Sequence, residues 1–237
     1  MKKIFLTAVL SITISMGAFA QSSPDEIKSR LQRVFPNSGQ YEPTFAPHVW
    51  ANIRESGAQS MFVYDDVQST LNNGNSNKGF WRSIREKQSL PETEQRTRFT
   101  AIYEAVKALR PIPQGNAQEG AMLLITAVDC PSCIELEREF SKRKTAYWVA
   151  PTYLSDNNKH KTQAAYCNAN PTKAWSDSMQ RRSVIGGVSA KCEYPDKDYK
   201  YLFWMVGGAT PTALFPDGTI AVGIRPIAQR LGIPMDN

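Results

Sequence analysis

The sequence predicts a mixed fold of helices and strands, with an α+β arrangement in its first half and an α/β arrangement in its second. Three observations support this prediction. Apolar residues at helical spacing alternate along the chain with short apolar runs of strand length. Prolines and a glycine divide the chain at residues 110–115. All four cysteines follow that division, at positions 130, 133, 167 and 192.

The composition is that of a folded protein. Of the 237 residues, 41% are hydrophobic, 10% aromatic and 21% charged, which excludes a wholly disordered, collagen-like or coiled-coil chain. Lys and Arg outnumber Asp and Glu by 28 to 22, an excess too small to indicate nucleic-acid binding. No stretch combines dense basic residues with aromatic ones, so we expect no nucleic-acid partner.

The first twenty residues are typical of a secretory signal peptide. Two lysines precede an apolar run at residues 4–16, and Ala18 and Ala20 supply the small residues of a cleavage site before Gln21. The run is shorter than the roughly 20 apolar residues that span a bilayer. We therefore expect cleavage and a mature chain in the periplasm or a similar compartment, where disulfides form.

The first half begins with an amphipathic helix. Ser23 and Glu26 have the spacing of a capping box around Pro24, and apolar residues follow at helical spacing to about Phe35. Two segments of strand character and two polar turns come next, at residues 49–53, 60–64, 55–57 and 72–79.

A second helix leads to the division of the chain. Its apolar residues recur at spacings of three and four within a charged stretch: Phe99, Ile102, Tyr103 and Val106. The pattern stops at the prolines and glycine of residues 110–115. We therefore place a domain boundary between residues 110 and 120.

The second half starts with the pattern of a strand, a helix and a strand. Residues 121–128 are almost continuously apolar, as in a strand buried on both faces, and lead directly to Cys130. A helical pattern follows, with Cys133, Leu136 and Phe140 on the apolar face and the charged residues, Glu137 among them, on the others. Residues 145–149 are apolar again, which completes a parallel unit with a right-handed crossover.

The remaining elements complete a mixed sheet. A polar, helix-like insertion spans about residues 155–195, and the expected helix, strand, turn and strand that follow lie at residues 198–206, 213–215, 216–218 and 220–222. This order is that of a thioredoxin-like domain with an insertion in its middle. We assign it to residues 116–237.

The spacing of Cys130 and Cys133 points to redox chemistry. Four cysteines allow three pairings, but this spacing puts two sulfurs one helical turn apart and favours their bridge, which leaves Cys167 for Cys192. At a helix start, the first sulfur lies beside unpaired N–H groups and the positive end of the helix dipole. We therefore expect Cys130 to be the nucleophilic thiolate and Cys133 the resolving thiol.

Two other interpretations of this pair stay open. A zinc half-site needs four ligands, and the two histidines, His48 and His160, do not lie near a second Cys-x-x-Cys pair, so we expect no metal. A purely structural bridge between Cys130 and Cys133 would close a very small loop and contribute little loop entropy.

The second half resembles the DsbC/DsbG family of periplasmic disulfide isomerases over residues 121–225. The resemblance rests on four segments: Val128-Asp129-Cys130-Pro131-Ser132-Cys133, Tyr166-Cys167, Ala190-Lys191-Cys192, and Gly208-Ala209-Thr210-Pro211-Thr212-Ala213-Leu214-Phe215-Pro216-Asp217-Gly218-Thr219-Ile220.

This resemblance implies a cis peptide bond before Pro211, with Thr210, Pro131 and Ser132 at the rim of the active site. It also implies a cystatin-like α+β dimerisation domain at residues 21–91, followed by a linker helix and hinge at residues 92–115. Strand edges near residues 60–71 are our candidates for pairing between the two copies. The implied partners are a second copy of the chain, misfolded exported proteins and a membrane thiol reductase of the DsbD type. No cofactor is implied. We expect the Cys167–Cys192 bridge to be structural and to staple the insertion.

Four residues bear on how closely the active site follows the family. Pro131 and Ser132 are not the usual isomerase dipeptide, and the charge of Asp129 opposes thiolate formation next to it. Leu124 stands where thioredoxins carry a buried carboxylate, in agreement with the isomerases.

Three functions fit these residues. The first is a dimeric disulfide isomerase in which reduced Cys130 attacks wrong disulfides. The second is a monomeric thiol oxidase, or a reductase dedicated to one partner. The third is a non-catalytic secreted binding module in which both bridges are structural.

Overall fold

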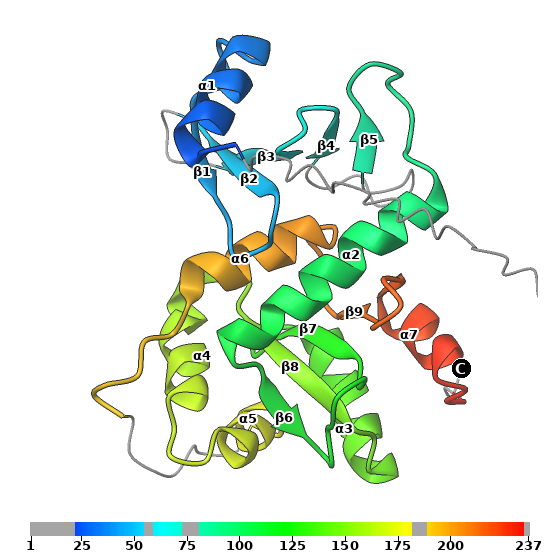
Figure 1. Ribbon diagram of the computed structural model, residues 1–237. Coiled ribbons are helices and arrows are strands. Elements are labelled where there is room, and N and C mark those ends of the chain that lie inside the picture. The colour runs from blue at the N-terminus through cyan, green and yellow to red at the C-terminus, as the bar shows by residue number, and fades with distance from the viewer. Residues whose placement is uncertain (1–21, 55–58, 73–80, 182–188, 235–237) are drawn as a thin grey trace, which may run out of the picture.

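The computed structural model describes residues 22–54, 59–72, 81–181 and 189–234. The predicted signal peptide, the turn at residues 55–57 and nearly all of the polar loop at 72–79 lie outside these residues. Figure 1 shows two sheets, one built from the first half of the chain and one from the second, with helices α2 and α6 between them.

The first half is a helix packed on an antiparallel sheet. Helix α1 spans Pro24–Val34 and has the predicted capping box, because the Ser23 hydroxyl accepts from the Glu26 N–H and the Glu26 carboxylate accepts from the Ser23 N–H. The strands follow chain order across the sheet: β1 (Gln40–Pro43), β2 (Val49–Ile53), β3 (Gln59–Tyr64), β4 (Ser69–Asn72) and β5 (Trp81–Ser83).

The expected pairing edge near residues 60–71 is wrong. Strand β3 pairs with β2 on one side and β4 on the other, and β4 pairs with β5, so both strands are interior. The outer strands of this sheet are β1 and β5. An interior strand has its backbone groups already paired and offers none to a partner chain.

Both faces of the first sheet are covered. Alternate side chains of a strand point to opposite faces. Trp50 of β2 and Val63 of β3 pack with Leu31 of α1. Val49 and Phe62, on the other face, belong to one continuous core shared with the second half. The two halves therefore have a common hydrophobic core.

Helix α6 (Asp196–Met205) contacts the first sheet directly. The rings of Phe62 and Tyr201 meet edge to face with centroids 5.6 Å apart. Glu42 of β1 accepts a hydrogen bond from the Tyr201 hydroxyl and forms an ion pair of 2.7 Å with Lys197.

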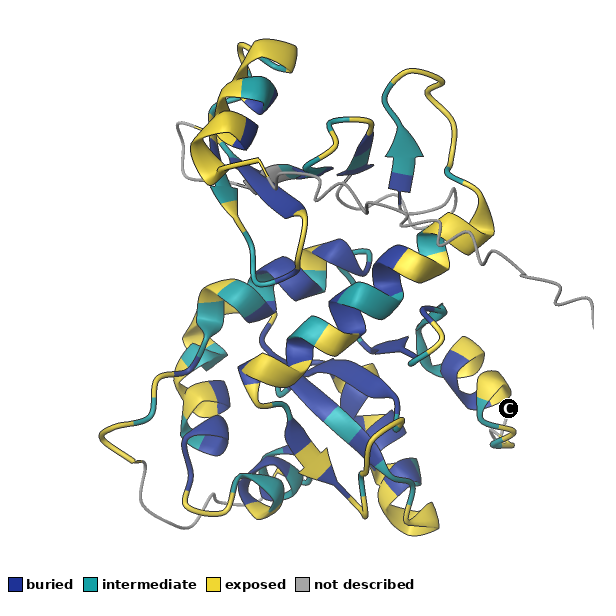
Figure 2. Ribbon diagram, in the orientation of Figure 1, coloured by how far each residue is buried: buried dark blue, intermediate teal, exposed yellow. Residues whose placement is uncertain are grey.

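Helix α2 spans Glu92–Val106 and continues as the 3-10 helix η1 (Lys107–Leu109). The predicted helix is present, and it packs against the rest of the molecule rather than standing free as a spacer. Its buried residues are Arg98, Phe99, Ile102, Tyr103 and Val106. A Cβ atom on Gly218 would lie 2.0 Å from the Arg96 carbonyl oxygen, which shows how closely the β9–β10 turn approaches this helix. Figure 2 shows buried residues along both α2 and α6.

The second sheet has the order β10-β9-β7-β8-β6. Its strands are β6 (Ile112–Gln114), β7 (Leu123–Ala127), β8 (Tyr147–Thr152), β9 (Thr212–Leu214) and β10 (Ile220–Val222). Strands β7 and β8 are parallel, as predicted, and the other pairs are antiparallel. Part of the segment expected to be a hinge is thus edge strand β6, where exposed Pro113 is tolerated.

The helices of the second half surround this sheet. They are α3 (Pro131–Arg143), the 3-10 helix η2 (Asp156–Asn158), α4 (Lys159–Tyr166), α5 (Pro171–Met179), α6 and α7 (Ile224–Arg230). Helices α4 and α5 form the predicted insertion between β8 and α6. Among the described residues, no helix combines the length and apolarity needed to cross a bilayer.

Candidate redox site

The path of the chain from β7 into α3 places Cys130 at a helix N-terminus. Strand β7 is buried at all five positions and ends at Ala127, and Cys130 is the N-cap residue of α3. Pro131 takes the first helical position, where its missing N–H removes no helical bond. The Cys130 Sγ atom accepts a hydrogen bond of 3.2 Å from the Cys133 N–H. This arrangement stabilises negative charge on Cys130.

All four cysteines are paired in the expected way. Cys130 is bonded to Cys133, and Cys167 to Cys192. Cys133 is completely buried, whereas Cys130 keeps 4% of its surface exposed at the edge of the site. Attack by an outside thiol or disulfide therefore has access to Cys130 only.

The segment before β9 forms the other side of the site. The peptide bond between Thr210 and Pro211 is cis, as the resemblance implies. The Thr210 carbonyl oxygen lies 3.5 Å from the Cys130 Sγ atom. Pro131 and Ser132 are exposed beside them. The structure thus brings together the residues expected at the active-site rim.

The Asp129 carboxylate is held by hydrogen bonds and is not an unpaired charge beside the cysteines. It accepts hydrogen bonds from the Leu154 N–H (2.9 Å), the Ser155 N–H (2.8 Å) and the Asn158 side-chain amide (3.1 Å). These donors belong to the segment that follows β8. Asp129 therefore fastens the loop before Cys130 to the beginning of the insertion.

A buried carboxylate lies further along α3, at Glu137, a residue that the helical pattern assigns to a polar face. It occupies the face of Cys133, four residues earlier, and accepts hydrogen bonds from Thr126 (2.6 Å), Tyr147 (3.0 Å) and Trp175 (2.9 Å). Burial raises the pKa of this carboxyl to about 7. Glu137 lies four residues after Cys133 and therefore on the same face of the helix. This spacing was the sequence signal that could have indicated its burial.

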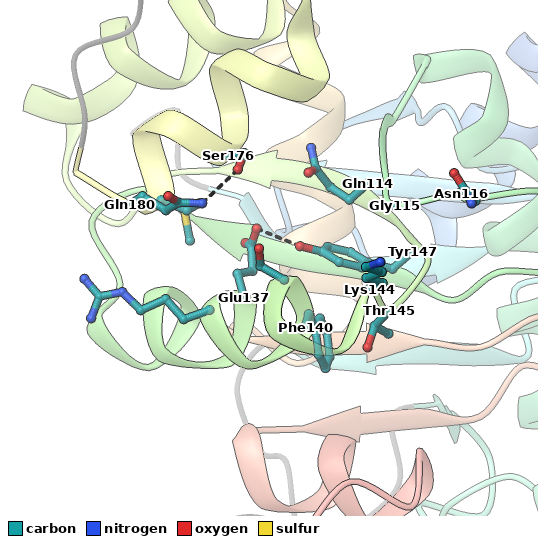
Figure 3. A pocket seen from close by; sticks show the side chains of 13 residues that line it. Gln114, Gly115, Asn116, Glu137, Phe140, Lys144, Thr145, Tyr147, Ser176 and Gln180 are labelled. Carbon is teal, nitrogen blue, oxygen red and sulfur yellow. Dashed lines mark hydrogen bonds between the residues drawn. The ribbon is translucent and has the colours of Figure 1, made fainter.

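Glu137 also lines a pocket of about 290 Å³ at the C-terminal end of α3, away from the cysteines (Figure 3). Its carboxylate points toward the Tyr147 hydroxyl in this view. Because protein donors already occupy three of its acceptor positions, it ties α3 to β7, β8 and α5. Leu124, which stands at the position where thioredoxins carry a buried carboxylate, is fully buried in the core.

The Cys167–Cys192 bridge lies within the insertion. Cys167 caps the C-terminus of α4. Cys192 lies 25 positions after Cys167 and precedes α6. His48 pairs with Asp65 at 2.7 Å on the first sheet. The described residues hold no cluster of three or more His, Cys, Asp or Glu side chains that could bind a metal.

The second half of the chain is a thioredoxin-like domain that carries a Cys-x-x-Cys disulfide at the start of the helix after its central strand. No protein-family model and no curated protein matches the chain.

Solved structures that are similar to it include two disulfide-related proteins. One is a disulfide interchange protein from Neisseria gonorrhoeae, with 25% identity and a TM-score of 0.43 over 51% of this chain and 91% of that one. The other is a linker-deletion variant of ScsC from Proteus mirabilis, with 15% identity and a TM-score of 0.41 over 59% and 84% of the two chains.

Proposed function

We propose that the chain is a periplasmic thiol–disulfide oxidoreductase that acts as a DsbC-like disulfide isomerase on exported proteins. The observation that carries this proposal is the environment of Cys130. Its sulfur lies at the N-cap of α3, accepts from the Cys133 N–H and lies 3.5 Å from the Thr210 carbonyl oxygen. A zinc site or a purely structural bridge does not require this arrangement.

The reaction begins with the reduced pair. The Cys130 thiolate attacks one sulfur of a wrong client disulfide, so that a mixed disulfide forms and the other client sulfur leaves as a thiolate. That thiolate can attack a different client disulfide and so create another client thiolate. A client thiolate finally attacks the mixed disulfide, forms a new client disulfide and releases the Cys130 thiolate, so the number of client disulfides is unchanged. This route is isomerisation.

The alternative exit is reduction of the client. Cys133 attacks the mixed disulfide, the second client sulfur leaves as a thiolate, and Cys130 and Cys133 become the disulfide described above. Two electrons pass from the protein to the client. A membrane thiol reductase of the DsbD type would then return both cysteines to the thiol form.

The isomerase proposal includes a homodimer formed through the N-terminal half. Its sheet offers the edge of β1 for pairing with a second copy, whereas the outer side of β5 is already bonded to residues 88–90. The signal peptide at residues 1–20 would direct the chain to the periplasm, and the Cys167–Cys192 bridge would serve as a structural staple.

A monomeric thiol oxidase or reductase, with one reactive cysteine pair, is the second candidate. It is favoured by the shared core of the two halves, because the N-terminal sheet is covered on both faces within one chain. In a monomer, α1 covers strands β1 to β3 on one face of this sheet, and the shared core covers the other face.

Refolding of a scrambled protein with several disulfides separates these candidates. In a glutathione buffer, we expect the mature chain to accelerate recovery of client activity, and the Cys130→Ser variant to lose that acceleration. A protein that reduces small disulfides but does not speed recovery of the scrambled client is a reductase, and the isomerase proposal then fails.

A further inference from the structure

A pocket of about 280 Å³ lies between the end of η1, edge strand β6 and the insertion. The Gln114 side chain of β6 donates to the Thr172 carbonyl of α5 at 3.1 Å, and Figure 1 shows these two elements side by side. The described residues that line the pocket include both cysteines of the Cys167–Cys192 bridge but neither Cys130 nor Cys133. We call it the Asn168 pocket, and it is separate from the redox site.

Asn168 carries an amide group without a hydrogen-bond partner. The residue lines the pocket, and only 8% of its surface is exposed. Its Oδ1 atom accepts from the Asn170 N–H at 2.9 Å, but no described residue accepts a hydrogen bond from its Nδ2 atom. Buried polar groups are hydrogen-bonded in most proteins, and leaving one unpaired is unfavourable. An acceptor oxygen placed in the pocket would satisfy this donor.

The charges around the pocket favour an anion. Arg110 lines it, and the described lining residues include no Asp or Glu. Burial raises the pKa of Tyr166, another lining residue, and the charge of Arg110 opposes this rise, which places the guanidinium near the pocket. Pro171 also lines the pocket and is the first residue of α5, so the positive end of this helix dipole lies there.

The rest of the lining is mainly apolar. The ring of Tyr166 is fixed, because its hydroxyl donates to the Leu109 carbonyl at 2.8 Å. Ile112 of β6 lies between two prolines, Pro111 and Pro113, and all three line the pocket. The volume is just below the roughly 300 to 1,000 Å³ of sites for drug-sized ligands. The pocket therefore fits a small ligand with a compact apolar part.

We propose that the Asn168 pocket binds a small organic acid, with its carboxylate at Asn168 and Arg110 and its apolar body against Tyr166 and Ile112. A carboxylate supplies the acceptor oxygen that the Asn168 amide lacks, and its charge complements the guanidinium. This site goes beyond the proposed redox function and does not depend on it.

Magnetic resonance of the isotope-labelled mature chain tests the site, with phenylacetate as the probe. Phenylacetamide, which has the same ring but no charge, is the matched control ligand. We expect phenylacetate to shift the side-chain amide resonance of Asn168 and the backbone amide resonance of Ser189, another lining residue, in a saturable way. For a ligand of this size, we expect a dissociation constant of about 1 mM. Phenylacetamide should bind about tenfold more weakly, because it lacks the charge-assisted bond.

Three variants locate the binding groups, with Ser189 as the reporter. We expect Arg110→Gln to raise the dissociation constant for phenylacetate about tenfold, and Asn168→Asp to raise it at least as much, because its carboxylate repels the probe. Arg138→Gln is the matched control, since Arg138 is an exposed cation that lines the Glu137 pocket instead. It should leave the affinity unchanged.

Equal affinity for phenylacetate and phenylacetamide would overturn the proposal, and so would resonances of Asn168 and Ser189 that do not move. Both results come from the unmodified chain, so they hold even where a variant folds poorly. An equal loss of affinity in Arg138→Gln and Arg110→Gln would also overturn it, because the attraction would then not be local to the pocket.

Discussion

The Glu137 carboxyl is a titrating group in the middle of the redox domain. Its three hydrogen-bond donors come from β7, β8 and α5, and the side chain is almost completely buried. Burial outweighs these donors and raises the pKa of the carboxyl from its ordinary 4.5 to about 7. The folded protein therefore keeps a proton that the unfolded chain releases in mildly acidic solution.

This difference makes stability depend on pH. Between pH 4.5 and 7 the unfolded chain loses the proton and the folded chain retains it, so the free energy of unfolding falls as the pH rises, by about 3 kcal/mol in total. We expect Glu137→Gln, whose amide can donate to Thr126, to remove this dependence. Urea unfolding at several pH values measures it.

Glu135→Gln is the matched control, since Glu135 is exposed on the same helix. This variant is expected to keep the pH dependence of the unmodified chain. A dependence that persists undiminished in Glu137→Gln would show that other groups cause it.

Two elements stabilise the redox domain. One is helix α2, which packs against it, and the other is the insertion, which the Cys167–Cys192 bridge cross-links. Phe99 of α2 is 98% buried and belongs to the core that both halves share. Thr100 of α2 donates to the Pro216 carbonyl of the β9–β10 turn at 3.3 Å. The structure therefore assigns α2 to the packing of both domains, beyond the role of a spacer.

Substitution in α2 measures that packing. We expect Phe99→Ala to lower the free energy of unfolding by about 3–5 kcal/mol, because it leaves a cavity in the common core. Thr93→Ala, at an exposed position of the same helix, should have little effect. Thermal unfolding followed by circular dichroism provides the comparison, and equal midpoints for the two variants would contradict a docked helix.

The staple is tested by removing both of its sulfurs. In the chain-entropy model, a bridge that closes a loop of this length contributes roughly 3 to 4 kcal/mol, so the Cys167→Ser, Cys192→Ser double variant should unfold at a lower temperature. Reduction of a small disulfide by the Cys130–Cys133 pair should persist. A variant of unchanged stability that has lost this activity would show that the roles of the two pairs are exchanged.

Boundary signals, more than element length, decided which parts of the fold could be predicted from sequence. Strands β9 and β10 have three residues each, but the turn at residues 216–218 between them marks both. Helix α1 and strand β2 have the predicted limits, or nearly so, because capping residues and apolar periods mark them. Strands β1, β4, β5 and β6 have only three or four residues, too few to establish a period, and Pro113 further conceals β6. In addition, β6 pairs with β8, which lies far along the chain, with Ile112 opposite Val149.

The site was predictable where a motif spans adjacent residues. The cysteine spacing and the Thr210-Pro211 pair led to the groups that meet at Cys130. Asp129 and Glu137 were misjudged, because a carboxylate in a loop or on the charged side of a helix is normally solvated. Two of their donors, Leu154 for Asp129 and Trp175 for Glu137, lie 25 and 38 residues away along the chain.

At the scale of the whole molecule, the open question is how many redox domains act together. An isomerase must hold a client while it attacks, and a homodimer would present two reactive pairs to one client. Light scattering of the mature chain at micromolar concentration measures the association state. We expect twice the mass of one chain, and a monomer would favour the single-headed oxidase or reductase.

The central claim is that Cys130 is the nucleophile of thiol–disulfide exchange. Trapping of a mixed disulfide tests it most directly, with a reduced variant incubated with a disulfide-containing client and the joined peptides located by mass spectrometry. We expect Cys133→Ser to accumulate a client bonded to Cys130, because the resolving thiol is missing. Cys130→Ser should trap none, since Cys133 is completely buried. A client bonded to Cys133 in the Cys130→Ser variant, or no trapped client in either variant, would contradict the claim.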